Sequence, residues 1–186
     1  MIVKFKKIGI LVNEDYINYK YLFMYRRKYN QLDSNSLYDK RSEEVNLVQS
    51  GEKKMIEKYS FIFDNLLSND CIIIPMVSEY ASKDTFLNLS KLVSEICSKK
   101  DERLDGSKLI TRKYYLDYIK DFYKEKFSID KLIIREDIDI VKGRKVIILT
   151  DVINNNLNGY LSYRSVIRKY APLSLKLIGL SRYVES

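Results

Sequence analysis

The sequence lacks histidine and tryptophan and has few cysteines, prolines and glycines. Without histidine, the 186-residue chain cannot form Ser–His or Cys–His catalytic pairs or histidine-bound metal sites. Its two cysteines, Cys71 and Cys97, are too few for a disulfide framework or a cysteine metal cluster, and they suit a reduced, cytoplasmic protein. Two prolines and six glycines argue against a long flexible linker. The longest apolar run, CIIIPMV, is far shorter than the ~20 residues that span a bilayer, so no membrane partner is expected.

What the chain does contain favours one globular domain. Hydrophobic residues make up 46% of the sequence and charged residues 31%, a balance typical of a folded protein. A length of 186 residues predicts a single domain, spanning 1–186, with a sizeable core. The net charge is +8 and the isoelectric point about 9.2, which permits a polyanionic partner such as nucleic acid. Because the lysines are spread along the chain, an ordinary solvated basic surface is the simpler interpretation.

The spacing of apolar residues predicts an α/β fold. Helical periodicity is clearest over residues 52–67 and recurs in two later segments. Continuous apolar runs predict buried strands at 71–76 and 145–151, and a further strand is expected over 175–184. Helices that alternate with strands predict a mainly parallel sheet flanked by helices.

The other segments have weaker patterns. Residues 1–51 are predicted to be an N-terminal extension, in which 8–12 is a strand candidate and 31–51 is polar and turn-like. Residues 99–141 are predicted to form a hood-like insert. Within the insert, residues 109–141 are compatible with a helix followed by short strands, and their register is left open.

Two loops, 77–84 and 152–159, follow the buried strands. In open α/β sheets, ligands bind beyond the carboxyl ends of the strands, where loops lead into helices. In the stretch VIILTDVINNNLNG, the strand ends in Asp151 and is followed by Asn154, Asn155, Asn156 and Asn158. Backbone N–H groups at the start of the next helix and the asparagine amides could bind a phosphate, while Asp151 could accept hydrogen bonds from sugar hydroxyls. The alternative is a polar turn in which one asparagine caps the helix.

The same stretch resembles a known signature. KGRKVIILTDVINNNLN is similar to the signature of type I phosphoribosyltransferases, which is an apolar strand, two adjacent acids, two apolar residues and a short Thr/Gly-rich loop. In that family the acids bind the ribose hydroxyls of phosphoribosyl pyrophosphate, which is bound with Mg²⁺, and the loop binds the 5′-phosphate. The resemblance implies a type I phosphoribosyltransferase-like fold. It assigns the ribose to Thr150 and Asp151, and the phosphate to Asn154, Asn155, Asn156 and Asn158.

Upstream, the layout is similar to one branch of this family, the competence-protein F group. The shared features are a strand ending in proline, a Phe–x–Asn element, a basic insert with an arginine, a basic residue before phenylalanine, and glycine before a basic residue. The matching residues are IIIPM, Phe86 and Asn88, Arg112, Lys126–Phe127, and Gly143–Arg144. The zinc-binding cysteines that often precede the domain in that group are absent from this sequence. The resemblance implies a role in DNA uptake or processing.

The sequence also departs from the family pattern. Thr150 replaces one of the two acids, which should weaken binding of the ribose hydroxyls. Asn154 stands where some members have an aspartate general base, and an amide does not accept a proton at neutral pH. The family's reaction needs positive charge near the pyrophosphate, for which Lys83, Arg112 and Lys113 are the candidates. The simpler interpretation of these three residues is exposed, solvated cations.

Two functional hypotheses follow. The first is a protein that binds phosphoribosyl pyrophosphate or a nucleotide phosphate, with impaired catalysis. The second is a non-catalytic competence or DNA-processing module with a basic nucleic-acid-binding surface. For the second, the stretch YINYKYLFMYRRKYN (16–30) interleaves tyrosines with cations, as single-strand-binding surfaces do. A packed, tyrosine-rich helix or strand is the alternative for this stretch, and the sequence predicts neither an acceptor base nor an oligomeric state.

Overall fold

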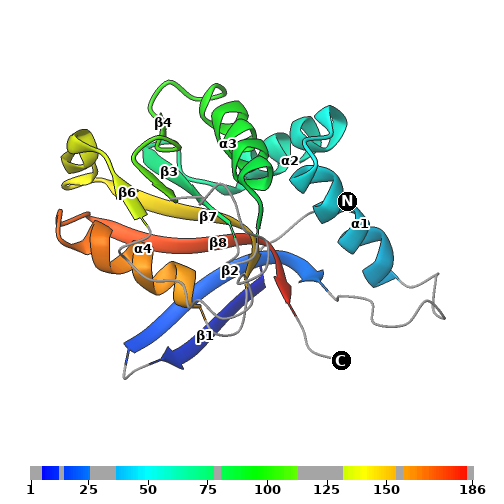
Figure 1. Cartoon of the computed structure of the whole chain (residues 1–186), viewed down its shortest axis with the longest axis horizontal. Helices are drawn as coiled ribbons and strands as arrows, with labels where there is room; N and C mark the ends of the chain where they lie inside the picture. Colours follow the sequence, from blue (N-terminus) through cyan, green and yellow to red (C-terminus); the bar gives the residue numbers. More distant parts are fainter. Residues whose placement is uncertain are drawn as a thin grey trace, which may run out of the picture.

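The computed structural model describes residues 6–12, 15–25, 37–77, 81–112, 132–153 and 157–183. Its centre is a six-stranded sheet with the strand order β1-β2-β8-β7-β3-β4 (Figure 1). The strands of this sheet are β1 (Lys6–Val12), β2 (Asp15–Tyr25), β3 (Cys71–Met76), β4 (Leu104–Asp105), β7 (Lys145–Ile153) and β8 (Ser174–Tyr183). Every neighbouring pair except β1–β2 is parallel, so the predicted α/β fold with a mainly parallel sheet is confirmed.

Helices cover both faces of this sheet (Figure 1). The α-helices of the described residues are α1 (Leu37–Gln49), α2 (Lys53–Leu66), α3 (Lys83–Cys97) and α4 (Asn158–Arg168). On one face, α1, α2 and α3 pack on the sheet in a core that includes Phe63, Leu92 and Leu149. On the other face, α4 contributes Tyr163 and Ile167 to a core that includes Ile148. Burial on both faces explains why β3 and β7 are continuously apolar rather than alternating.

The N-terminal residues belong to the same sheet. β2 pairs in parallel with β8, and β1 pairs antiparallel with β2, so the strand candidate at 8–12 is confirmed. The prediction that 31–51 is turn-like is wrong where α1 lies. This helix is mostly polar, but Val45 and Val48 are buried in the core. Tertiary packing of these few side chains, rather than a strong apolar stripe, stabilises α1.

Part of the predicted insert forms a small separate sheet. β5 (Ile110–Arg112) pairs antiparallel with β6 (Leu132–Ile134), and the 3-10 helix η2 (Glu136–Val141) follows. The short strands expected late in 109–141 include IDIV, residues 138–141, and there the prediction is wrong, because these residues end η2. Ile138 and Val141 are both buried, and their three-residue spacing fits one face of a 3-10 helix.

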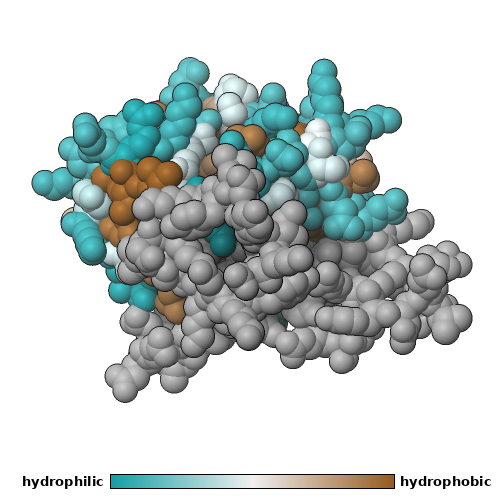
Figure 2. Space-filling model, in the orientation of Figure 1, coloured by the Kyte–Doolittle hydropathy of each residue, from teal (hydrophilic) through white to brown (hydrophobic). Residues whose placement is uncertain are grey.

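The surface near this small sheet carries an apolar patch. Figure 2 shows a group of hydrophobic residues there in brown, whereas most of the described surface around them is hydrophilic. The exposed apolar residues of β6 and η2 are Ile133, Ile134 and Ile140. The segment predicted to be hood-like therefore places apolar side chains outside the core, although 113–131 lies outside the described residues.

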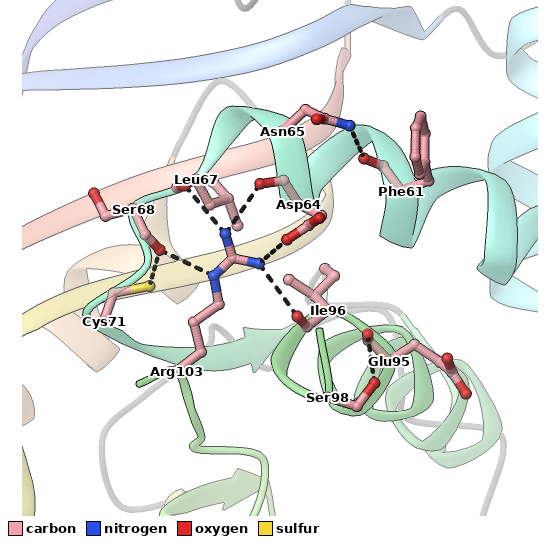
Figure 3. A network of polar contacts seen from close by, with 10 residues as sticks. All are labelled: Phe61, Asp64, Asn65, Leu67, Ser68, Cys71, Glu95, Ile96, Ser98 and Arg103. Atoms are coloured by element: carbon pink, nitrogen blue, oxygen red, sulfur yellow. Dashed lines mark hydrogen bonds and ion pairs between the residues drawn. The ribbon is translucent and has the colours of Figure 1, made fainter. Parts of the chain in front are cut away.

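A buried arginine joins the carboxyl ends of α2 and α3 (Figure 3). Arg103 Nε donates to the carbonyl of Ser68 at 3.0 Å, and Nη2 donates to the carbonyls of Asp64 and Leu67 at 3.0 and 3.2 Å. Its Nη1 donates to the carbonyl of Ile96 at 3.2 Å and to the Asp64 carboxylate at 2.7 Å. Carbonyls at helix ends have no intrahelical partner, so this one side chain satisfies acceptors of two helices at once.

Candidate functional site

The structure places the ends of β3 and β7 side by side. These strands pair in parallel, with Met76 opposite Thr150. From β3 the chain continues through α3 to β4 on one side, and from β7 it continues through α4 to β8 on the other. Two neighbouring strands whose connections lead to opposite sides of the sheet form a topological switch point, which is the usual ligand site of an open α/β sheet. Both loops singled out in the sequence therefore lead away from one topological switch point.

The helices that leave the switch point start differently. At α3, the sequence offers Ser82 or Asp84 as the cap, and the structure shows Ser82, whose hydroxyl accepts a hydrogen bond from the Thr85 N–H at 3.1 Å. At α4, the N-cap is Leu157, which has left-handed backbone angles of φ 52° and ψ 14°. A leucine side chain cannot accept a hydrogen bond, and Asn154, Asn155 and Asn156 lie outside the described residues, so a cap by one of these asparagines stays a prediction.

Asp151 lies two residues before the end of β7, in a fully buried position. Only 1% of the residue is exposed. Its Oδ1 accepts hydrogen bonds from the Val152 N–H at 2.8 Å and from the Thr150 hydroxyl at 3.2 Å. Its Oδ2 accepts from the Gln49 amide at 2.6 Å. Burial raises the pKa of Asp151, while these hydrogen bonds oppose that shift.

Gln49 was missed by the sequence analysis. It is the last residue of α1 and lies 102 positions from Asp151 in the chain, within a segment interpreted as turn-like. No local pattern signals such a contact, because the helix that delivers Gln49 has only a weak apolar stripe.

Arg182 was missed as well. It lies near the end of β8, opposite Ile153 of β7. Its Nε is buried and has no hydrogen-bond partner among the described residues. A signal was present in the sequence, since Arg182 is a cation near the carboxyl end of a strand and follows the apolar run LIGL.

The other predicted basic residues differ in position. Lys83 is exposed at the first turn of α3, at the same edge of the sheet as the ends of β3 and β7. Arg112 is half-buried on β5 in the small sheet and already interacts with other groups. Lys83 is therefore the better placed of the two for an anion at the switch point, and Lys113 lies outside the described residues.

The predicted phosphate residues are only partly described. Asn158 is half-buried and opens α4. Asn154, Asn155 and Asn156 lie outside the described residues. The structure therefore brings Thr150, Asp151 and the start of α4 to one edge of the sheet.

The nucleic-acid surface is described only at its centre. The residues of the stretch 16–30 whose side chains are described are Lys20, Tyr21 and Leu22. Tyr21 is 2% exposed and belongs to the core, as the packed-strand alternative requires. A nucleic-acid partner stays a prediction.

The described residues of this site offer few ligands for a metal ion, and Mg²⁺ bound with phosphoribosyl pyrophosphate stays a prediction. In the described ranges, no three acidic or cysteine side chains are grouped to hold a metal ion. The Asp151 carboxylate already accepts three hydrogen bonds in a buried position. The proposal below therefore does not depend on Mg²⁺ held by these residues.

The sequence was compared with protein-family models and with curated proteins. The chain matches no protein-family model, and no curated protein is similar to it in sequence. Among the described residues, the helices are too short or too polar to cross a membrane.

Proposed function

We propose that the chain binds the phosphate group of phosphoribosyl pyrophosphate or of a nucleotide at the carboxyl ends of β3 and β7, in a type I phosphoribosyltransferase-like arrangement. One observation carries this proposal: α4 begins at the switch point, so its N-terminus and that of α3 both lie at the carboxyl ends of β3 and β7. The first N–H groups of a helix have no intrahelical acceptor, and the helix dipole favours an anion near them. A bound phosphate would accept hydrogen bonds from these groups.

The backbone at Leu157 supports a ligand at this position. The left-handed conformation costs a leucine about 1–2 kcal/mol, and such strain concentrates at ligand sites. Leu157 is only 4% exposed and belongs to the same core cluster as Met76 and Tyr160. Burial of this side chain offsets the backbone cost and fixes where α4 begins.

Charge at the edge of the sheet also supports an anion. Lys83 opens α3 and Arg182 lies near the end of β8. The net charge of +8 adds a general attraction for anions.

The same residues favour binding over glycosyl transfer. The hydroxyl of Thr150, at the position of the family's first acid, is buried and lies 3.2 Å from Asp151 Oδ1. A single buried carboxylate that is already hydrogen-bonded provides weak recognition of ribose. The proposed activity is therefore phosphate binding, with transfer not required.

An isosteric charge change tests this proposal. Asn158→Asp places a negative charge on the first residue of α4, where the helix dipole favours it but a bound phosphate is repelled. Calorimetric titration with phosphoribosyl pyrophosphate and with inorganic phosphate should give at least about tenfold weaker binding for this variant.

Asn69→Asp is the matched control. Asn69 is exposed just before β3, at the opposite edge of the sheet, and its substitution changes the net charge equally. The control should bind like the wild type. Absence of binding to the wild type at millimolar ligand, or equal weakening in both variants, would contradict a site at α4.

A further inference from the structure

The Asp151 carboxylate at the proposed site already accepts hydrogen bonds from other groups of the protein. Gln49 Nε2 donates to Asp151 Oδ2 at 2.6 Å, and the other oxygen accepts from Val152 and Thr150. The two latter donors lie on β7 itself, whereas Gln49 comes from α1. Among the described residues, Gln49 is thus the donor to the Asp151 carboxylate that belongs to another element.

Gln49 is held in position by α3. Asn88 Nδ2 donates to the Gln49 carbonyl at 3.0 Å, and Lys91 Nζ donates to Asn88 Oδ1 at 3.0 Å. Gly51 follows α1 with φ +81°, and a Cβ atom there would lie 2.6 Å from Asn88 Oδ1. The close approach of Gly51 and Asn88 fixes the carboxyl end of α1, so the amide of Gln49 is presented to Asp151 by a packed structure.

This contact has a consequence for sugar recognition. A ribose is recognised through its vicinal hydroxyls, which donate hydrogen bonds to carboxylate oxygens. At Asp151 the Gln49 amide makes the equivalent donation. Because Asp151 is 1% exposed, a sugar hydroxyl can reach Oδ2 only by displacing Gln49.

We propose that Gln49 determines the ligand specificity of the site by denying Asp151 to sugar hydroxyls. The site then binds phosphate-bearing ligands without discriminating those with a ribose diol from those without one. This inference rests on the proposed phosphate site and adds the class of ligand that it accepts.

Gln49→Met tests the inference, because methionine lacks the donor, and its flexible side chain, no longer hydrogen-bonded to Asp151, can move aside for a sugar hydroxyl. The probes are a ribonucleoside 5′-monophosphate, its 2′,3′-dideoxy analogue and inorganic phosphate, titrated by calorimetry. In the wild type the two nucleotides should have dissociation constants within about twofold of each other. In Gln49→Met the diol should improve binding about tenfold, because a hydrogen bond to a charged group is worth at least this much.

Two further variants show whether the gain acts through Asp151. Asp151→Asn combined with Gln49→Met should lose the preference for the diol. Asn46→Ala, on the exposed side of α1, should retain the wild-type ratio. If Gln49→Met does not fold, Gln49→Asn shortens the side chain and withdraws the amide from Asp151.

The outcomes separate this inference from the proposed function. Inorganic phosphate that binds neither wild type nor variant would overturn both. Phosphate binding with a diol preference already present in the wild type, or unchanged in Gln49→Met, would overturn the role of Gln49 alone.

Discussion

Replacing Arg103 with methionine should strongly destabilise the fold, because all the N–H groups of its guanidinium are used. The side chain is fully buried, and its donors meet four backbone carbonyls and the Asp64 carboxylate. Methionine fills much of the volume but donates nothing, so acceptors at the ends of α2 and α3 lose their partner.

The size of the loss follows from the burial of this ion pair. Removing one partner of a buried pair costs about 3–5 kcal/mol. The side chain of Asp64 is 19% exposed, so water can solvate part of its charge. We therefore expect about 3–4 kcal/mol, which for a domain of this length corresponds to a fall in Tm of about 10 °C.

The assay is equilibrium urea unfolding followed by circular dichroism, with the m-value checked for constancy. Arg135→Met is the matched control, because Arg135 pairs with Asp137 at 3.2 Å on the surface. Both side chains of that pair are more than half exposed, so its loss should change stability by less than about 0.5 kcal/mol. A loss below about 1 kcal/mol for Arg103→Met, or an equal loss for the control, would refute the reasoning.

Three further predictions concern named positions. The stability of the wild type relative to Asp151→Asn should fall as pH rises above 3.8, the ordinary pKa of aspartate, because burial raises the folded-state pKa. Urea unfolding at a series of pH values measures this difference, and a rise would contradict it. Gly51→Ala should lower the free energy of unfolding by about 2–3 kcal/mol, because the added Cβ atom meets Asn88. Gly143→Ala should lower it by about 1 kcal/mol, because φ is +67° there but a Cβ atom has no other atom within 4 Å. Paired urea titrations compare the two variants. Burial raises the pKa of Cys71, and raises that of Cys97 to about 12, so thiol reagents should react far more slowly with the native than with the unfolded protein.

The parts of the fold with a local pattern were predictable. Continuous apolar runs indicated the buried strands β3 and β7. Periodic apolar residues likewise indicated the buried faces of α2 and α3, because each of these patterns is contained in a short stretch of sequence. α1 was missed because its burial depends on two valines in a polar segment, and its helix is stabilised from outside. η2 was misread because alternating Ile138 and Ile140 resemble a strand, although only Ile138 is buried.

The site was predictable in position but not in its contacts. The rule for strand ends located Asp151 and the start of α4 without any structure. The Gln49 contact could not be predicted, because it joins residues 102 positions apart. The left-handed Leu157 also had no signal, since leucine, unlike glycine or asparagine, does not favour that conformation.

Mapping backbone amide chemical shifts during a titration with phosphate would test the central claim most directly. Phosphate binding at the switch point predicts the largest, saturable shifts at the N–H groups of Asn158, Gly159 and Tyr160, in the first turn of α4. Shifts confined to β1 and β2, or the absence of saturable shifts at α4, would contradict a phosphate site there.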